Sequence, residues 1–155
     1  MNQKLSNWAS VAEIASGIGV IVTLIILILG VRQNTESVRA SAYADNSNSL
    51  NQFQTQVLTD PDALRVWNAF VSQDMENLDE LDRQRRTLMV LTLFRVYENA
   101  YLFERRGFLG NDEWERFERN ICFWFERVKP TQSLVALRDT MTTGFFDYVS
   151  ESCSN

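Results

Sequence analysis

The uncharged stretch "IASGIGVIVTLIILILGV", from Ile14 to Val31, decides the class of this 155-residue chain. Glu13 and Arg32 bound it, and no ionisable side chain lies between them. As a helix rising about 1.5 Å per residue, the stretch would span about 27 Å, close to the hydrocarbon thickness of a bilayer. We therefore predict one transmembrane helix and a lipid bilayer as its surroundings.

Two other structures can contain a long apolar stretch. A signal peptide has a shorter apolar region followed closely by a small-residue cleavage site. Here the nearest such site, Ala40 to Ala42, lies beyond Arg32, Glu36 and Arg39. A buried core helix rarely runs this far without a charged residue. Both alternatives fit less well than a membrane anchor.

The orientation of the predicted anchor depends on few charges. Lys4 precedes the span, and Arg32 and Arg39 follow it. The side of a membrane helix with more Lys and Arg usually lies in the cytoplasm. The excess of one basic residue predicts a cytoplasmic C-terminal domain.

Small residues recur along one face of the predicted span. They are Ala12, Ser16, Gly19, Thr23 and Gly30. Small side chains let two helix backbones approach closely in lipid, where packing drives association. Such residues are also common in membrane helices generally. We expect this face to support a homo-oligomer, which the mass of the detergent-solubilised particle would reveal.

Beyond Arg32 the chain contains no glycine or proline until Pro61, so the helix can continue out of the membrane as a stalk. Tyr43, Leu50 and Val57 recur every seven residues along it. A seven-residue apolar repeat is typical of helices that pair with one another. We expect this side of the stalk to contribute to self-assembly.

The rest of the chain carries signals for further helices. An acidic or amide residue placed before an apolar helical stripe is a favoured N-cap, and proline is favoured directly after it. The long helix from Asp79 should end near Arg106, where Gly107 can adopt the left-handed conformation. The predicted helix starts are Asp60 before Pro61, Asp79, Asn111 and a position near Thr131.

No alternation typical of β-strands persists, so we predict an all-α fold. The predicted order is an N-terminal transmembrane helix that continues into a helical stalk, followed by a small helical bundle. The corresponding ranges are residues 1–32, 33–59 and 60–155.

Composition excludes several functions. The net charge of −5 disfavours binding to nucleic acid, whose phosphates require a basic surface. The chain has no histidine, which removes the commonest general base and metal ligand. Cys122 and Cys153 lie 31 residues apart and match no metal or redox motif. A disulfide between them is possible but not required, and Cys122 is otherwise a small core residue. We predict no metal and no cofactor.

The stretch "LTLFRVYENAYLF", from Leu91 to Phe103, contains the polar residues most suggestive of a site. Arg95 lies three residues before Glu98 and four before Asn99, within reach of both on a helix. We interpret the three as a buried polar cluster at the centre of the bundle. Two alternatives are an anionic ligand held by Arg95 and a general acid or base at Glu98. The latter needs a second reactive group, which the sequence does not supply. We predict no catalytic residue.

Four segments together resemble a widespread, uncharacterised family of small bacterial single-pass membrane proteins. They are "VRQNT" (31–35), "DPDALRVW" (60–67), "FRVYENAY" (94–101) and "GFLGNDEW" (107–114). The resemblance covers almost the whole chain. It implies a bacterial inner membrane and the layout above, but it implies no activity and no site residues.

The expected function is therefore that of a non-enzymatic, self-associating scaffold or an accessory subunit of another membrane protein. The alternative is a homo-oligomeric small channel or ligand sensor, with the transmembrane helices around a central axis. Conductance in a planar bilayer would distinguish a channel from a scaffold.

Overall fold

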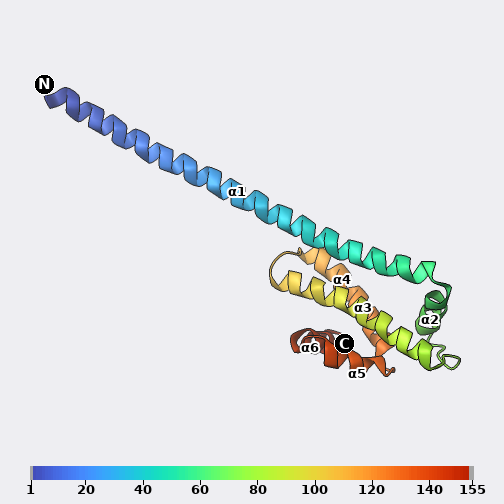
Figure 1. The fold of residues 1–155 in the computed structure, drawn as a ribbon. Coiled ribbons are helices and arrows are strands. Elements are labelled where there is room, and N and C mark those ends of the chain that lie inside the picture. The colour runs from blue at the N-terminus through green and yellow to red at the C-terminus, as the bar shows by residue number, and fades with distance from the viewer. Residues whose placement is uncertain (1, 154–155) are drawn as a thin grey trace. The chain divides into compact units, whose positions relative to one another are not determined.

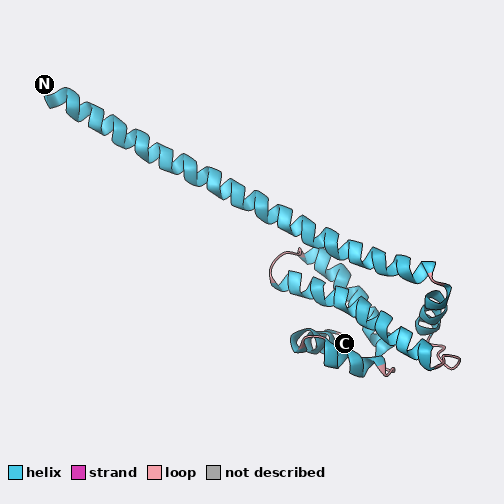
Figure 2. Ribbon diagram, viewed as in Figure 1, coloured by secondary structure: helices cyan, strands magenta, loops and turns pink. Residues whose placement is uncertain are grey.

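The computed structural model describes the backbone of residues 2–153, and the side chains of residue 13 and of residues 16–153. Over residues 2–153 it contains six helices and no strand. Figures 1 and 2 draw these helices as ribbons. The all-α prediction is confirmed. The helices are α1 (Asn2–Thr59), α2 (Pro61–Ser72), α3 (Glu80–Arg105), α4 (Asn111–Val128), α5 (Ser133–Thr140) and α6 (Thr143–Ser152).

The chain divides into two compact units, residues 1–40 and residues 41–155. The last third of α1 therefore belongs to the bundle, whereas the sequence predicts a separate stalk over residues 33–59. Phe53 and Val57 lie in the bundle core, and Tyr43 and Leu50 pack against it. The apolar repeat expected to support self-assembly is thus covered by helices of its own chain. Tyr43 and Leu50 are only partly buried, so self-assembly through this side stays a prediction.

The first unit contains the apolar part of α1. Within the described residues, α1 is the one helix that is long and apolar enough to cross a membrane. Its large apolar side chains between Ile18 and Val31 are 48% to 64% exposed. A core helix would bury such side chains against its own chain, and here none of the apolar window is buried. This helix could cross a membrane.

The small-residue face of the span is exposed at Ser16, Gly19, Thr23 and Gly30. The Thr23 hydroxyl donates a hydrogen bond to the Gly19 carbonyl at 2.8 Å, which satisfies it within the helix. A Cβ atom added at Gly19 or Gly30 would meet nothing within 4 Å. The side chain of Ala12 lies outside the described residues. Self-association through this face stays a prediction.

Two of the predicted helix starts are confirmed. The Asp60 carboxylate accepts hydrogen bonds from the backbone N–H groups of Asp62 and Ala63, at 2.9 and 3.2 Å, and Pro61 opens α2. The Asp79 carboxylate accepts the N–H of Asp82 at 2.8 Å at the start of α3. In each case the side chain satisfies an N–H group that the helix itself leaves unpaired.

The junction between α3 and α4 differs from the prediction by one residue. Gly107 has a φ of +71° and follows the end of α3, as expected. The residue before α4 is Gly110, however, and Asn111 is the first helical residue. The Glu113 carboxylate reaches back and accepts the Gly110 N–H at 2.8 Å. This single hydrogen bond satisfies the Gly110 N–H, and no side chain caps α4 from position 111.

The second unit is organised around α3, which packs against α2, α4 and α5. This explains why α3 is mainly apolar between Leu88 and Phe103. A disulfide between Cys122 in α4 and Cys153 at the end of α6 links the last helix of the unit covalently to α4. Cys122 is therefore not a free core cysteine. The largest fully buried side chains include Phe70, Phe94, Ile121, Leu137 and Phe145.

An ion pair joins α2 to α3. The two terminal guanidinium nitrogens of Arg65 donate to the two carboxylate oxygens of Asp82 at 2.8 and 2.6 Å. The residue Asp82 is 4% exposed. The hydrogen bonds from Arg65 are the main cause that lowers the pKa of Asp82, and burial opposes them. A bidentate pair of this kind fixes the relative orientation of two helices.

We expect the stability contributed by the Asp82 charge to depend on pH. Because its folded pKa is lowered, the contribution is complete above the unfolded carboxyl pKa of about 3.9 and is lost as the pH falls through the lower folded value. Asp82→Asn should therefore lower the melting temperature at pH 7, and its difference from the wild type should shrink in acid. Asp62→Asn is the control, since that side chain is 65% exposed. A difference that persists unchanged in acid would contradict the assignment.

Candidate functional site

The polar cluster predicted from the sequence is only partly assembled. Glu98 is 2% exposed. The Arg95 side chain is 56% exposed, and Asn99 is exposed as well. Leu88 and Thr92 are also exposed. The successive intervals between Leu88, Thr92, Arg95 and Asn99 are four, three and four residues, so all four lie on one solvent-facing stripe of α3. The expected buried cluster is thus corrected to a single buried carboxylate.

Both oxygens of the Glu98 carboxylate have structural partners. One accepts a hydrogen bond from Arg95 at 3.0 Å, and the other accepts the backbone N–H of Thr142 at 2.6 Å. Thr142 directly precedes α6, so the carboxylate lies where the partial positive charge of that helix begins. Glu98 therefore joins α3 to the start of α6. With both oxygens engaged, it is poorly placed to act as a general acid or base.

Arg95 offers little for the alternative of an anionic ligand. Its charge is paired with Glu98, and its side chain is largely in solvent. An exposed, already paired guanidinium binds an added anion weakly.

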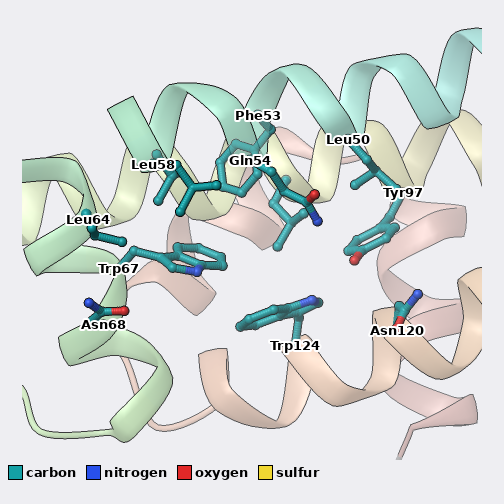
Figure 3. A pocket seen from close by; sticks show the side chains of 12 residues that line it. Leu50, Phe53, Gln54, Leu58, Leu64, Trp67, Asn68, Tyr97, Asn120 and Trp124 are labelled. Carbon is teal, nitrogen blue, oxygen red and sulfur yellow. The ribbon is translucent and has the colours of Figure 1, made fainter. Parts of the chain in front are cut away.

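A different feature has the properties of a binding site. A cavity of about 460 Å³ lies within the second unit, between the end of α1 and helices α2, α3 and α4 (Figure 3). We call it the aromatic groove. Ligand sites commonly measure about 300 to 1,000 Å³. The sequence alone does not predict this groove.

Aromatic rings form much of the groove surface. The indoles of Trp67 and Trp124 lie 4.9 Å apart between centroids, at 45° to each other. Phe53 packs edge-on against Trp67 at 5.3 Å. Aromatic neighbours at these separations attract one another beyond the burial of their area. The rings therefore give the groove a fixed wall.

Tyr97 brings a buried hydroxyl to the groove. The residue is 2% exposed, and Figure 3 shows its hydroxyl directed toward the indole nitrogen of Trp124. Burial raises the pKa of Tyr97 well above its usual value, and a hydrogen bond with Trp124 partly opposes this. The hydroxyl therefore stays protonated and neutral at physiological pH.

Three amide side chains, those of Gln54, Asn68 and Asn120, complete the polar part of the lining. All three residues are exposed and lie on three different helices. The remaining lining residues are aliphatic, so no charged side chain lines the groove. Amides both donate and accept hydrogen bonds without carrying charge. The chemistry of the groove thus suits a mainly apolar, uncharged ligand.

The groove contains no pair of groups suited to acid–base catalysis. Tyr97 is its one titratable lining residue. Among the described residues, no group of three or more Cys, Asp or Glu side chains is arranged to hold a metal ion. The chemistry available in the groove is hydrogen bonding and ring stacking.

Comparisons of the chain with protein-family models, with curated proteins and with solved structures found no match. The family resemblance therefore stays a prediction.

Proposed function

We propose that this chain is a single-pass membrane protein that acts by binding rather than by catalysis, with the aromatic groove as its binding site. The observation that carries the proposal is the groove itself, whose ring wall and amide rim converge from four helices without a charged residue. Pockets of mainly apolar lining with a few convergent polar groups are the usual form of a ligand site.

Helix α1 supports the link between anchor and binding site. The same helix carries the exposed apolar stretch from Ile18 to Val31 and contributes Phe53 and Gln54 to the groove lining. A ligand in the groove would therefore contact the helix that enters the membrane. This favours a ligand sensor or an accessory subunit over an enzyme. Self-association through the span remains part of the proposal and is measured by particle mass in detergent.

The disulfide bears on the orientation in the membrane. Disulfides are rare in the cytosol and persist in oxidising compartments. The Cys122–Cys153 bond therefore outweighs the excess of one basic residue that predicted a cytoplasmic domain. We propose that residues 41–155 face the oxidising side, which in the bacterial plasma membrane implied by the family resemblance is the outer side.

The binding role can be tested with the full chain in detergent. We expect a ligand-observed NMR screen of small ring compounds, both neutral and charged, to find hits that compete for one site. Asn120→Trp places a large side chain on the groove rim and should abolish these hits. Asn111→Trp is the matched control, because Asn111 is exposed in the same helix and does not line the groove. If no compound distinguishes the two variants, the groove is not a binding site.

A further inference from the structure

A buried guanidinium in α3 lacks a strong hydrogen-bond acceptor. Arg86 is 6% exposed, and its Nε atom has no hydrogen-bond partner among the described side chains and backbone. The acceptor seen for this guanidinium is the Met75 sulfur, which lies 2.9 Å from a terminal nitrogen. A guanidinium carries five N–H donors, whereas a thioether sulfur accepts only weakly. The hydrogen-bonding capacity of Arg86 is therefore largely unused.

The charge of Arg86 is also poorly compensated. None of the ion pairs observed across residues 16–153 involves this residue. Burial lowers the pKa of Arg86, and the nearby positive charge of Arg83 adds to this effect. A neighbouring carboxylate would raise the pKa instead. A better acceptor beside the guanidinium would therefore stabilise the folded chain.

The sulfur beside Arg86 lies where an oxidant can reach it. Met75 is partly exposed and belongs to the connection between α2, which ends at Ser72, and α3. It is not among the described residues that pack against the core, whereas Met89 packs against it and Met141 is 7% exposed within it. Exposure favours oxidation of a side-chain sulfur. Of these three methionines, Met75 is the best placed for oxidation.

Oxidation would supply the acceptor that Arg86 lacks. Hydrogen peroxide transfers one oxygen atom to the Met75 sulfur, so that an S–O bond forms, the O–O bond breaks and water leaves. The sulfur is oxidised by two electrons and the peroxide is reduced by two. The sulfoxide is polar, and the rotatable bonds of the side chain let its oxygen turn toward the guanidinium. A hydrogen bond from a charged donor is about twice as strong as one between neutral groups.

We propose that Met75 is a peroxide-sensitive modification site and that the Arg86 guanidinium binds the sulfoxide oxygen formed there. Methionine oxidation commonly disrupts packing because it makes an apolar side chain polar. Here the new oxygen meets an underused donor, so oxidation fastens the connection between α2 and α3 to α3 itself. A neutral oxygen also suits this connection better than an added anion, which Asp74, Glu76 and Asp79 would repel. The inference is independent of ligand binding in the aromatic groove.

The test uses the full chain in detergent, treated with hydrogen peroxide until mass spectrometry of its peptides shows conversion of Met75. We expect the melting temperature to rise by about 3–5 °C, as one charge-assisted hydrogen bond would give in a unit of this size. Methionine sulfoxide reductase should restore the original value. Met75→Leu treated alike measures oxidation at other residues, and its shift is subtracted. Met89→Leu, the matched control, retains Met75 and should show the full rise.

Two further variants test the part played by Arg86. Arg86→Gln removes the charged donor, so oxidation of Met75 should then cause no rise. Met75→Gln places a neutral carbonyl oxygen near the guanidinium without any oxidation and should melt at a higher temperature than Met75→Leu. This second comparison leaves Arg86 in place, so it decides the question even if Arg86→Gln does not fold.

Four results would each overturn the proposal. The first is a Met75 sulfur that stays unmodified under conditions that oxidise Met89. The second is a melting temperature that falls or does not change once Met75 is oxidised. The third is Met75→Gln melting no higher than Met75→Leu, and the fourth is a rise that persists in Arg86→Gln, which would assign the stabilisation to another donor.

Discussion

The double variant Cys122→Ser, Cys153→Ser is expected to lose about 3–4 kcal/mol of unfolding free energy, because the disulfide closes a long loop of the unfolded chain. The two cysteines are separated by 31 residues and connect α4 to the end of α6. Without the bond, α6 retains the Tyr148–Glu118 hydrogen bond and the contact of Tyr148 with Trp114. The measurement is urea denaturation of the full chain in detergent, followed by circular dichroism.

Reductant provides the control for this loss. Reduced wild-type protein should unfold at the same urea concentration as the double variant, and reductant should not affect the double variant. The oxidation state in the cell can be measured by denaturing the protein directly from intact cells without reductant and then adding a maleimide–polyethylene glycol reagent. This reagent should leave both cysteines unmodified. Labelling of both would contradict the bond and the proposed orientation together.

Much of the fold is predictable from local signals. Asp60 with Pro61, Asp79 and Gly107 each act within a few residues of their own position, through caps or a left-handed turn. The apolar stretch of α1 is likewise recognisable because only its own composition matters. The predicted Asn111 cap is wrong because a glycine can also precede a helix, and here the Glu113 carboxylate accepts the Gly110 N–H.

Tertiary partners are less predictable. The repeat of Tyr43, Leu50 and Val57 reveals an apolar face but not whether a copy or the same chain will cover it. Similarly, Trp67 and Trp124 each fit an ordinary core stripe of a helix. They become part of a groove only because α2 and α4 meet at the end of α1. No spacing within one helix contains that information.

The stretch that includes Arg95, Glu98 and Asn99 shows the same limit within one helix. A spacing of three residues on a helix allows Arg95 to contact Glu98, and the two side chains are hydrogen-bonded. The depth of each residue depends on which face the neighbouring helices cover. Glu98 faces Thr142 of the α6 cap, 44 residues away, whereas Arg95 and Asn99 face solvent.

Glu98→Ala is expected to lower the unfolding free energy by about 3 kcal/mol, because the Thr142 N–H loses a charged acceptor and the buried Glu98 side chain leaves a cavity. The acceptor lost is the one 2.6 Å from the Thr142 N–H, at the start of α6. Glu98→Gln keeps an acceptor oxygen and should lose only about 1 kcal/mol, the difference between a charged and a neutral hydrogen bond. Arg95→Gln should lose no more than about 0.5 kcal/mol, since pairs with an exposed partner contribute little. Urea denaturation of the three variants would establish this order. A loss at Arg95→Gln equal to that at Glu98→Ala would show instead that the ion pair, rather than the cap of α6, holds Glu98 in place.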